Sequence, residues 1–466
     1  MNEQIETKKE NKMGVMPVGR LLLTMSIPMV ISMLVQALYN VVDSMFVAQI
    51  SENALTAVSL AFPAQNLMIA VATGTGVGIN ALLSRSLGEK NFRRANNTAD
   101  NAVFLALCSF IAFALIGGIF SRVFFRLQTD VTEIIDYGTA YLQICTIGSI
   151  GLFLQVTFEK LLQATGRTFY TMLTQGLGAI INIVLDPILI FGLLGMPKMG
   201  VAGAAVATIC GQIIASILAV VLNMKKNHEI ELKFKGFRPS KLIIARIYSV
   251  GVPSIMMAAI GSVMTFGINK ILISFTTTAT AVFGVYFKLQ SFVFMPIFGL
   301  NNGMVPIIAY NYGARKPERL TKTIKLSIAA AVLIMVIGFV LFQTITEQLL
   351  MIFNASDNML EIGVPALRII SICFLLAGFS IISSSLFQAL SHGLLSLFVS
   401  LLRQLLILLP AAYLLSLSGK LNLIWWAFPL MRVISTLYLQ ERNQADVRNG
   451  LVKSFTRHSI KTGLSH

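Results

Sequence analysis

Long apolar segments separated by short polar turns run along almost the whole chain. Each reaches roughly 20 residues, the length that an α-helix needs to cross the hydrocarbon core of a bilayer. Twelve such segments cover residues 21–50, 54–84, 97–121, 136–158, 168–193, 200–224, 242–274, 279–309, 321–345, 362–388, 393–417 and 421–440. The pattern predicts an all-α polytopic membrane protein with twelve transmembrane helices.

The composition agrees with this interpretation. Of the 466 residues, 56% are hydrophobic and 12% are charged, whereas about 25% of the residues in an average soluble domain are charged. A soluble protein of this size could not bury so much apolar surface. We therefore expect the lipid bilayer to surround most of the chain.

The net charge of +16 could suggest a nucleic-acid-binding protein, but the positions of the basic residues indicate membrane topology instead. Lys and Arg gather in the stretches 85–94, 225–246 and 315–325 and after residue 440. With an even number of segments, these stretches and both termini share one side of the membrane. The loops of the other side contain Arg122, Arg126, Lys198 and Lys420. The positive-inside rule therefore predicts cytoplasmic termini, and we expect no nucleic acid as a partner.

The two halves of the chain repeat each other at a constant shift of 225 residues, which takes Pro28 to Pro253. The same shift pairs Phe62 with Phe287, Gln65 with Gln290, Gly74 with Gly299, Gly78 with Gly303, Gly88 with Gly313 and Gly138 with Gly363. One shift holds without a gap from residue 28 to 164, through prolines, glycines and loop lengths alike. This regularity indicates an internal duplication.

The duplication predicts the domain organisation. Six helices per half is an even number, so both halves enter the membrane in the same direction and form a pseudo-symmetric parallel repeat with a central cleft. Two bundles that can rock against each other are typical of a secondary transporter. We expect a cytoplasmic N-terminal segment (1–20), an N-terminal six-helix lobe (21–224), a cytoplasmic loop between the lobes (225–241), a C-terminal six-helix lobe (242–440) and a cytoplasmic tail (441–466).

Few acidic residues lie deep inside the predicted helices. Of the 20 Asp and Glu residues, only Asp43, Glu159 and Asp186 do so, and all three belong to the first half. A carboxylate in hydrocarbon costs several kcal/mol unless it faces a bundle interior or a water-filled cavity. Such a group can bind H⁺ or Na⁺ reversibly, as a cation-coupled transporter requires. The alternative is a carboxylate paired with an in-span base for packing alone.

Asp186 has a suitable neighbour in the segment "NIVLDPILIFG". Asn182 lies four residues earlier and therefore on the same helix face. An amide and a carboxylate together offer oxygen ligands for Na⁺ or for a proton-relay water. Pro187 leaves a backbone carbonyl unpaired one turn earlier and can bend the helix. Pro28, fifteen residues before Asp43, could couple bending of the first helix to the charge of Asp43.

The sequence gives no sign of an enzyme. The glycines of "TGTGVG" lie mid-span, without a preceding strand or a following Lys, so they favour close helix packing over a nucleotide loop. The four histidines and four cysteines form no cluster with metal-ligand spacing. We therefore expect no catalytic residues, no cofactor and no structural metal.

Several motifs together resemble the bacterial MATE family of multidrug and toxic compound extrusion exporters, in the MOP superfamily. These are "YNVVDSMFV", "NIVLDPILIFG", "MGVAGAAVAT", "VPIIAYNYGARK", "FQALSHGLLSLFVSLLRQLLILLPAAYLL" and "WWAFPL". The resemblance extends from about residue 16 to 440 and implies a multi-pass protein of the bacterial inner membrane. It further implies export of amphipathic cationic drugs by antiport with H⁺ or Na⁺ through alternating access. A monomer is the simplest expectation.

The resemblance also implies the ion site. In similar proteins an Asp on the first helix and an Asn and an Asp on the fifth form it, which corresponds to Asp43, Asn182 and Asp186 here. Thr208 is the candidate for a threonine that often joins them. Asn40, Glu159 and Gln36 are further candidates for coupling or substrate binding, and Pro28 and Pro187 for helix bending. The same three ligands could hold Na⁺.

Two departures from the family pattern bear on function. Ser391 stands in "QALSHG" where Gly is usual, and Arg432 stands near a position where similar sequences often carry Glu. The arginine weakens the case for an ion site in the second lobe. One alternative function is export of lipid-linked oligosaccharide or polysaccharide, which would use a basic cavity formed by Lys288, Arg368 and Arg403.

Overall fold

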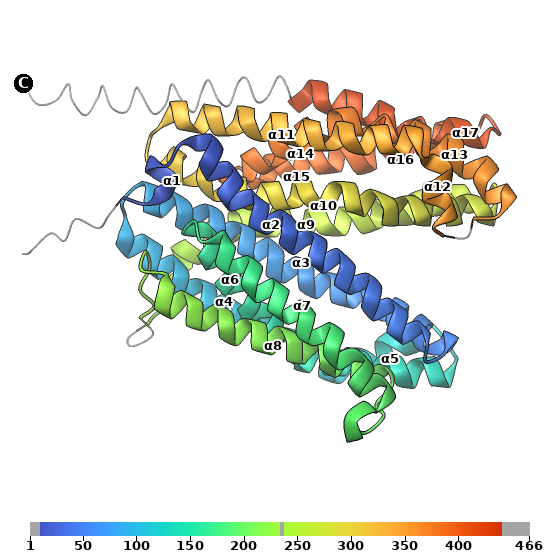
Figure 1. Cartoon of the computed structure of the whole chain (residues 1–466), viewed down its shortest axis with the longest axis horizontal. Helices are drawn as coiled ribbons and strands as arrows, with labels where there is room; N and C mark the ends of the chain where they lie inside the picture. Colours follow the sequence, from blue (N-terminus) through green and yellow to red (C-terminus); the bar gives the residue numbers. More distant parts are fainter. Residues whose placement is uncertain (1–9, 234–236, 354, 440–466) are drawn as a thin grey trace, which may run out of the picture.

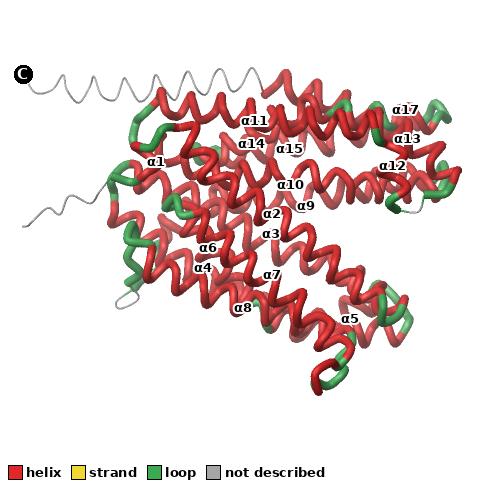
Figure 2. The backbone as a smooth tube through the Cα atoms, in the orientation of Figure 1, coloured by secondary structure: helices red, strands yellow, loops and turns green. Residues whose placement is uncertain are grey.

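The protein is a pair of helical bundles in a computed structural model that describes residues 10–233, 237–353 and 355–439. Figure 2 shows helices joined by short loops, with no strand in these ranges. The structure confirms the predicted all-α membrane fold. The cytoplasmic tail expected at 441–466 and the first nine residues lie outside the described ranges.

The first bundle contains the helices before residue 227, preceded by the short helix α1. These are α1 (Lys12–Val15), α2 (Val18–Ala48), α3 (Glu52–Gly88), α4 (Phe92–Arg126), α5 (Thr132–Ile147), α6 (Ile150–Ala164), α7 (Thr168–Phe191) and α8 (Val201–Lys226). The prolines predicted to bend helices, Pro28 in α2 and Pro187 in α7, lie inside continuous helices.

The second bundle repeats this order. It contains α9 (Lys241–Ile273), α10 (Thr277–Gly313), α11 (Pro317–Thr344), α12 (Thr346–Met351), α13 (Asp357–Ser371), α14 (Phe374–Ala389), α15 (Gly393–Leu401), α16 (Leu409–Ser416) and α17 (Leu421–Ile424). A π-helical stretch, Leu402–Leu408, joins α15 to α16. Residues 427–439 are helical up to the end of the described chain.

Eleven of the twelve predicted spans are found in the described residues. Nine single helices are long and apolar enough to cross a membrane, and two bent helix pairs raise the number to eleven. The twelfth expected segment, 421–440, contains α17 and the helix that begins at residue 427.

The straight helices expected at 136–158 and 362–388 are instead bent pairs. The angle is 44° between α5 and α6 and 50° between α13 and α14. At each break an amide bonds the carbonyl three residues earlier, as Ser149 does to Thr146 and Cys373 to Ile370. This tighter bonding interrupts the α-helical pattern and turns the chain. The two bends lie 224 residues apart (373 − 149), within one residue of the shift found in the sequence, so the duplication extends to this irregularity.

Small residues let the two bundles touch. In Figure 1, α2 and α3 of the first bundle lie beside α10 and α9 of the second near α1, and the bundles diverge toward the opposite end. A Cβ added at Gly303 would lie 2.5 Å from Ser26 Oγ, and one added at Gly78 would collide with the Ile247 carbonyl. These glycines therefore serve close helix packing, as expected for the mid-span "TGTGVG" run.

The buried apolar residues form one cluster that both bundles share and another within the first bundle. One buried apolar cluster near α1 contains residues of both bundles, among them Leu21 and Ile79 from the first and Ile247 and Ile307 from the second. A second cluster, which includes Phe125 and Ile190, is formed by first-bundle residues alone. The bundles therefore share a core near α1. We call this end, formed by α1, the turns 89–91 and 314–316 and the connecting residues 227–233 and 237–240, the basic end.

Candidate functional site

The two aspartates singled out in the sequence meet inside the first bundle. Asp43 projects from α2 and Asp186 from α7, two helices that pack against each other. Their carboxyl groups lie within hydrogen-bonding reach of one another. Asp186 is fully buried and Asp43 is partly buried. The structure thus joins residues that are 143 positions apart (186 − 43) into one carboxyl pair.

Asn182 and Thr208 complete the cluster. With its amide nitrogen toward Asp186, Asn182 donates a hydrogen bond of 3.1 Å to Asp186 Oδ2. Its oxygen then accepts bonds of 3.1 Å from both the backbone N–H and the hydroxyl of Thr208. Thr208 on α8 therefore fixes the amide, and the amide orients the carboxyl group of Asp186. The helical spacing of four residues between Asn182 and Asp186 makes this contact geometrically natural.

One oxygen of each carboxyl group is left without a partner. Asp43 Oδ1 and Asp186 Oδ1 are both buried, and neither is hydrogen-bonded in the described structure. Buried polar atoms in proteins almost always have a partner, so each unsatisfied atom calls for a physical reason. A transported proton or cation would supply one. None of the ion pairs between described residues involves Asp43, Glu159 or Asp186, contrary to the packing alternative.

Sequence reasoning missed a set of polar neighbours contributed by α2, α3 and α5. Tyr39 lies close enough to both aspartates to interact with their charges. Gln65 donates to the hydroxyl of Tyr141 at 3.1 Å and contacts Cys145 Sγ at 3.6 Å. Gln65 had a signal in the sequence, because it is one of the positions kept by the repeat. Tyr141 and Cys145 had none beyond their spacing of four residues.

Glu159 occupies a separate polar site on α6. Its Oε1 accepts hydrogen bonds from Gln155 at 3.0 Å and Thr174 at 2.9 Å, and its Oε2 accepts one from Gln175 at 2.7 Å. The carboxyl group is buried and fully engaged by these donors. No described contact connects it with the Asp43 cluster. Its role as a coupling residue therefore stays a prediction.

The remaining candidates lie along α2. Asn40 and Gln36 precede Asp43 by three and seven residues, a spacing that places all three on one helix face. Both are exposed. Pro28 lies farther toward the basic end, where its carbonyl accepts a hydrogen bond of 3.0 Å from Ser32. Among the residues described, no group of three or more His, Cys, Asp or Glu is placed to hold a metal.

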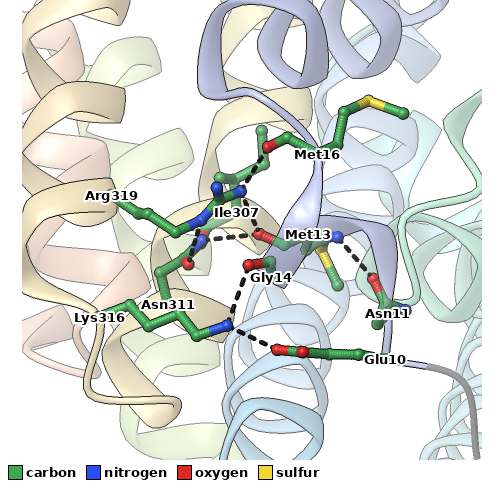
Figure 3. Close-up of polar contacts among 9 residues, drawn as sticks. All are labelled: Glu10, Asn11, Met13, Gly14, Met16, Ile307, Asn311, Lys316 and Arg319. Carbon is green, nitrogen blue, oxygen red and sulfur yellow. Dashed lines mark hydrogen bonds and ion pairs between the residues drawn. The ribbon is translucent and has the colours of Figure 1, made fainter.

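The N-terminal segment contacts both bundles at the basic end, and Figure 3 shows its polar contacts with the second bundle. Arg319 donates to the carbonyls of Met13 at 3.0 Å and Met16 at 2.7 Å. Asn311 also donates to the Met13 carbonyl, at 3.1 Å. On the other side, Asn11 donates to the carbonyl of Thr165 in the first bundle at 3.1 Å. The α1 segment therefore ties the two bundles together at this end.

An ion pair strengthens the same tie. Lys316 Nζ contacts Glu10 Oε1 at 2.6 Å and donates to the Gly14 carbonyl at 3.0 Å (Figure 3). The hydrogen bond from Lys316 lowers the pKa of Glu10 below its ordinary value. The pair is partly exposed, so its contribution is modest.

The chain matches a known family over both halves. The model of the MatE family covers residues 28–188 and 253–414, more than half of the chain. The two matched segments begin 225 residues apart (253 − 28), at the shift found in the sequence.

Curated relatives and solved structures agree with this match. A FAD transporter of Shewanella oneidensis is 26% identical over 433 residues, which cover 91% of this chain and 95% of the relative. The multidrug export protein MepA of Staphylococcus haemolyticus is 26% identical over 402 residues, 86% of this chain and 88% of the relative.

Among solved structures, an outward-facing multidrug resistance MATE transporter of the MOP superfamily superposes with a TM-score of 0.89. It is 24% identical, and the match covers 96% of this chain and 99% of that one. A MATE structure in complex with MaL6 also reaches 0.89, at 25% identity, over 95% and 99% of the two chains. The chain belongs to the MatE family and is a membrane transporter, not an enzyme.

Proposed function

We propose that this transporter exports amphipathic organic cations by antiport, with the carboxyl pair of Asp43 and Asp186 as the coupling site. The observation that carries the proposal is the contact between two acidic groups inside the first bundle. Two ionised carboxylates in contact would repel each other, so such a pair is stable with a proton between its oxygens. A cationic solute that approaches the pair would favour loss of that proton. Proton and solute thus compete, which is the thermodynamic basis of antiport.

The arrangement favours H⁺ over Na⁺ as the coupling ion. The oxygen of Asn182 already accepts two hydrogen bonds from Thr208, and its nitrogen faces Asp186. In this geometry the amide oxygen is not presented as a ligand for Na⁺, which binds through oxygen atoms. The proposal is therefore a proton antiporter.

We infer the orientation of the transporter in the membrane from its basic residues. We place the basic end on the cytoplasmic side of a bacterial inner membrane. This end carries the basic stretches, and the positive-inside rule predicts that such stretches face the cytoplasm. In this orientation the structure is closed toward the cytoplasm by α1 and the inter-lobe glycines. Alternating access then consists of opening the basic end while the two lobes, residues 21–224 and 242–440, close at the other end. The transporter works as a monomer in this scheme.

The relatives support a drug as substrate, since MepA is described as a multidrug export protein. The lipid-linked sugar alternative has less support. Lys288 and Arg368, two of the three bases expected to line its cavity, are exposed. Lys288 lies over the ring of Phe353, and Arg368 donates to Thr346.

Transport in proteoliposomes tests the proposal. Ethidium efflux is measured under an imposed H⁺ gradient and, separately, under an imposed Na⁺ gradient. We expect efflux with the H⁺ gradient and its loss in the Asp186→Asn variant. Glu133→Gln is the matched control, because Glu133 lies in the first turn of α5 and outside the carboxyl cluster. Efflux driven only by the Na⁺ gradient would show that Na⁺, and not H⁺, is the coupling ion. Absence of efflux with both gradients would reject drug antiport.

A further inference from the structure

The second bundle contains a buried arginine without a counter-charge. Arg432 is 7% exposed, and its Nε and Nη1 atoms have no hydrogen-bond partner in the described structure. A buried, unpaired charge is among the most costly features that a protein can hold. The unpaired donor atoms call for a partner that the second bundle itself does not supply.

The second bundle holds another buried donor without an acceptor, and further polar groups lie close to Arg432. Trp425 is fully buried, and its indole Nε1–H has no partner either. Arg403 lies close enough for its guanidinium charge to be felt by that of Arg432. Tyr286 and Cys373 also lie beside Arg432. Donors without acceptors form a site for an anion, because each N–H can then be satisfied by an oxygen of the bound group.

The acids of the second bundle are placed elsewhere. Between residues 241 and 439 the sequence contains Glu318, Glu347, Asp357 and Glu361. All four lie in the first turn of α11, α12 or α13 or close to it, and none forms an ion pair with Arg403 or Arg432 in the structure as described. The charge of the two arginines is therefore not neutralised within the bundle.

Aromatic rings gather at Tyr286, which lies beside Arg432. The ring of Phe283 lies 6.1 Å from that of Tyr286, 6.3 Å from that of Trp425 and 5.8 Å from that of Phe428, measured between centroids. Phe428 and Arg432 lie four residues apart in the helix that begins at residue 427, and therefore on one helix face. Guanidinium groups and aromatic rings together recognise flat acidic molecules, one through paired hydrogen bonds and the other through stacking.

The backbone near Arg403 is irregular as well. Arg403 is the second residue of the π-helical stretch Leu402–Leu408, which ends shortly before Pro410. Pro410 has no N–H for the helix ladder, which gives a local reason for the irregularity. Single π-helical turns occur frequently at functional sites. Arg403 therefore projects from a π-helical backbone and not from a regular α-helix.

We propose that Arg432, with Arg403 beside it, binds the acidic group of an aromatic solute, a carboxylate or a phosphate, within the second bundle. The inference rests on the proposed export function and refines its substrate class. An aromatic zwitterion could bind to both bundles. Its cationic part would contact the acidic residues of the first bundle, and its acidic group would contact the arginines of the second. The transporter would then handle aromatic zwitterions better than the corresponding pure cations.

A matched pair of dyes tests the proposal. Tetramethylrhodamine carries a free carboxyl group, and its methyl ester is the same cation without that charge. Binding of each dye to the full-length protein in detergent is followed by fluorescence anisotropy, without any ion gradient. We expect Arg432→Gln to weaken binding of the free acid by about tenfold or more, the usual effect of losing a hydrogen bond to a charged group. Binding of the ester should change by less than about twofold.

Controls separate this effect from misfolding. Arg368→Gln removes an exposed arginine of the same bundle and should leave both dyes unaffected. Arg432→Lys keeps the charge and should recover part of the affinity for the free acid. Equal loss of both dyes in Arg432→Gln, or no loss of the free acid, would overturn the proposal. Because binding is measured at equilibrium, failure of gradient-driven efflux would reject the antiport proposal without changing this result.

A second arm distinguishes a solute from a lipid headgroup, whose phosphate has the same chemistry. Thermal unfolding is measured in micelles with phosphatidylglycerol or with phosphatidylcholine. We expect the free-acid dye to stabilise the wild type in either lipid, and Arg432→Gln to lose this effect. The opposite result would be stabilisation by phosphatidylglycerol that is lost in Arg432→Gln, together with no binding of the free-acid dye. It would assign the arginines to a lipid headgroup and overturn the proposal of a solute.

Discussion

Lys160 of the first bundle and Asn302 of the second are joined by a hydrogen bond of 2.9 Å between Nζ and Oδ1. The same ammonium group donates to Gln163 Oε1 at 2.9 Å and is only 8% exposed. The lysine stem packs on Gly76, where an added Cβ would lie 2.7 Å from Lys160 Cγ. This buried hydrogen bond links the two bundles in the conformation described here. It must break if the bundles separate at Lys160 and Asn302.

Asn302→Ala should therefore shift the transporter toward the conformation that is open at the basic end. Removing the acceptor leaves a buried ammonium with one partner fewer, which costs about 1–3 kcal/mol in the closed state. Distances between spin labels at Arg93 and Lys322, exposed positions on α4 and α11, would report the shift. Asn301→Ala is the control, because Asn301 Oδ1 has no described partner. An unchanged distance distribution in Asn302→Ala would contradict the idea.

Arg319→Ala should release the N-terminal segment. The guanidinium group contacts three residues, the backbone of Met13 and Met16 and the side chain of Asn311 at 3.2 Å. Without it, hydrogen exchange at residues 12–16 should accelerate by about tenfold or more, since charged hydrogen bonds contribute about 1.5–3 kcal/mol each. Lys322→Ala, an exposed change one turn away on α11, should leave the exchange rates unchanged. Equal rates in both variants would mean that the segment is held by other contacts.

Stability should fall in acid because of Glu89, which lies at the basic end. Burial raises the pKa of Glu89, but the hydrogen bond from Arg85 and the charges of Arg85 and Arg94 outweigh it, so that the pKa lies below its ordinary value of 4.5. A lowered carboxyl pKa stabilises the fold above the ordinary value, and the effect is lost as the pH falls through the lowered pKa.

Thermal unfolding of the wild type and Glu89→Gln at two pH values measures this effect. The wild type should unfold at the higher temperature at pH of about 7, and the difference should shrink below pH of about 4. A difference that stays constant over this range would exclude the carboxylate charge as its cause. Glu89 is partly exposed, so the effect should be about 1 kcal/mol or less.

Ser391→Gly should stabilise the second bundle. Ser391 has a φ of 66°, the left-handed region where a side chain is strained. Gly166, at the equivalent place of the first half (391 − 225), has a φ of 86°. The glycine substitution should raise the free energy of unfolding by about 1 kcal/mol, and Gly166→Ala should lower it by a similar amount. Thermal unfolding in detergent measures both, and a destabilised Ser391→Gly would show that the serine side chain makes a compensating contact.

The sequence predicted the features that depend on local spacing. Asn182 and Asp186 lie on one face because they are four residues apart, whereas the grouping of Asp43 with them was predicted from the family resemblance and not from spacing. The bend at Ser149 was not predicted, because it depends on a change from four-residue to three-residue bonding in an otherwise apolar helix. The contact between Arg319 and Met13 was also beyond reach, since nothing in either segment indicates a partner 306 residues away.

Thr208 offers a test of how the carboxyl pair is oriented. Its hydroxyl and backbone N–H both bond the oxygen of Asn182, which in turn donates to Asp186. Thr208→Val keeps the shape and the backbone bond but removes the hydroxyl, so the amide is held less firmly toward Asp186. If the pair carries the coupling proton, the loss of about 1 kcal/mol should shift the proton concentration for half-maximal efflux by about fivefold.

The maximal rate of efflux should stay within about twofold of the wild type, because Thr208 touches neither carboxyl group. Thr208→Ser keeps the hydroxyl and should behave as the wild type. A residue needed only for folding would lower the amount of active protein and the maximal rate, and it would leave the proton dependence unmoved. A change in maximal rate alone would therefore assign Thr208 to packing and separate it from the coupling cluster.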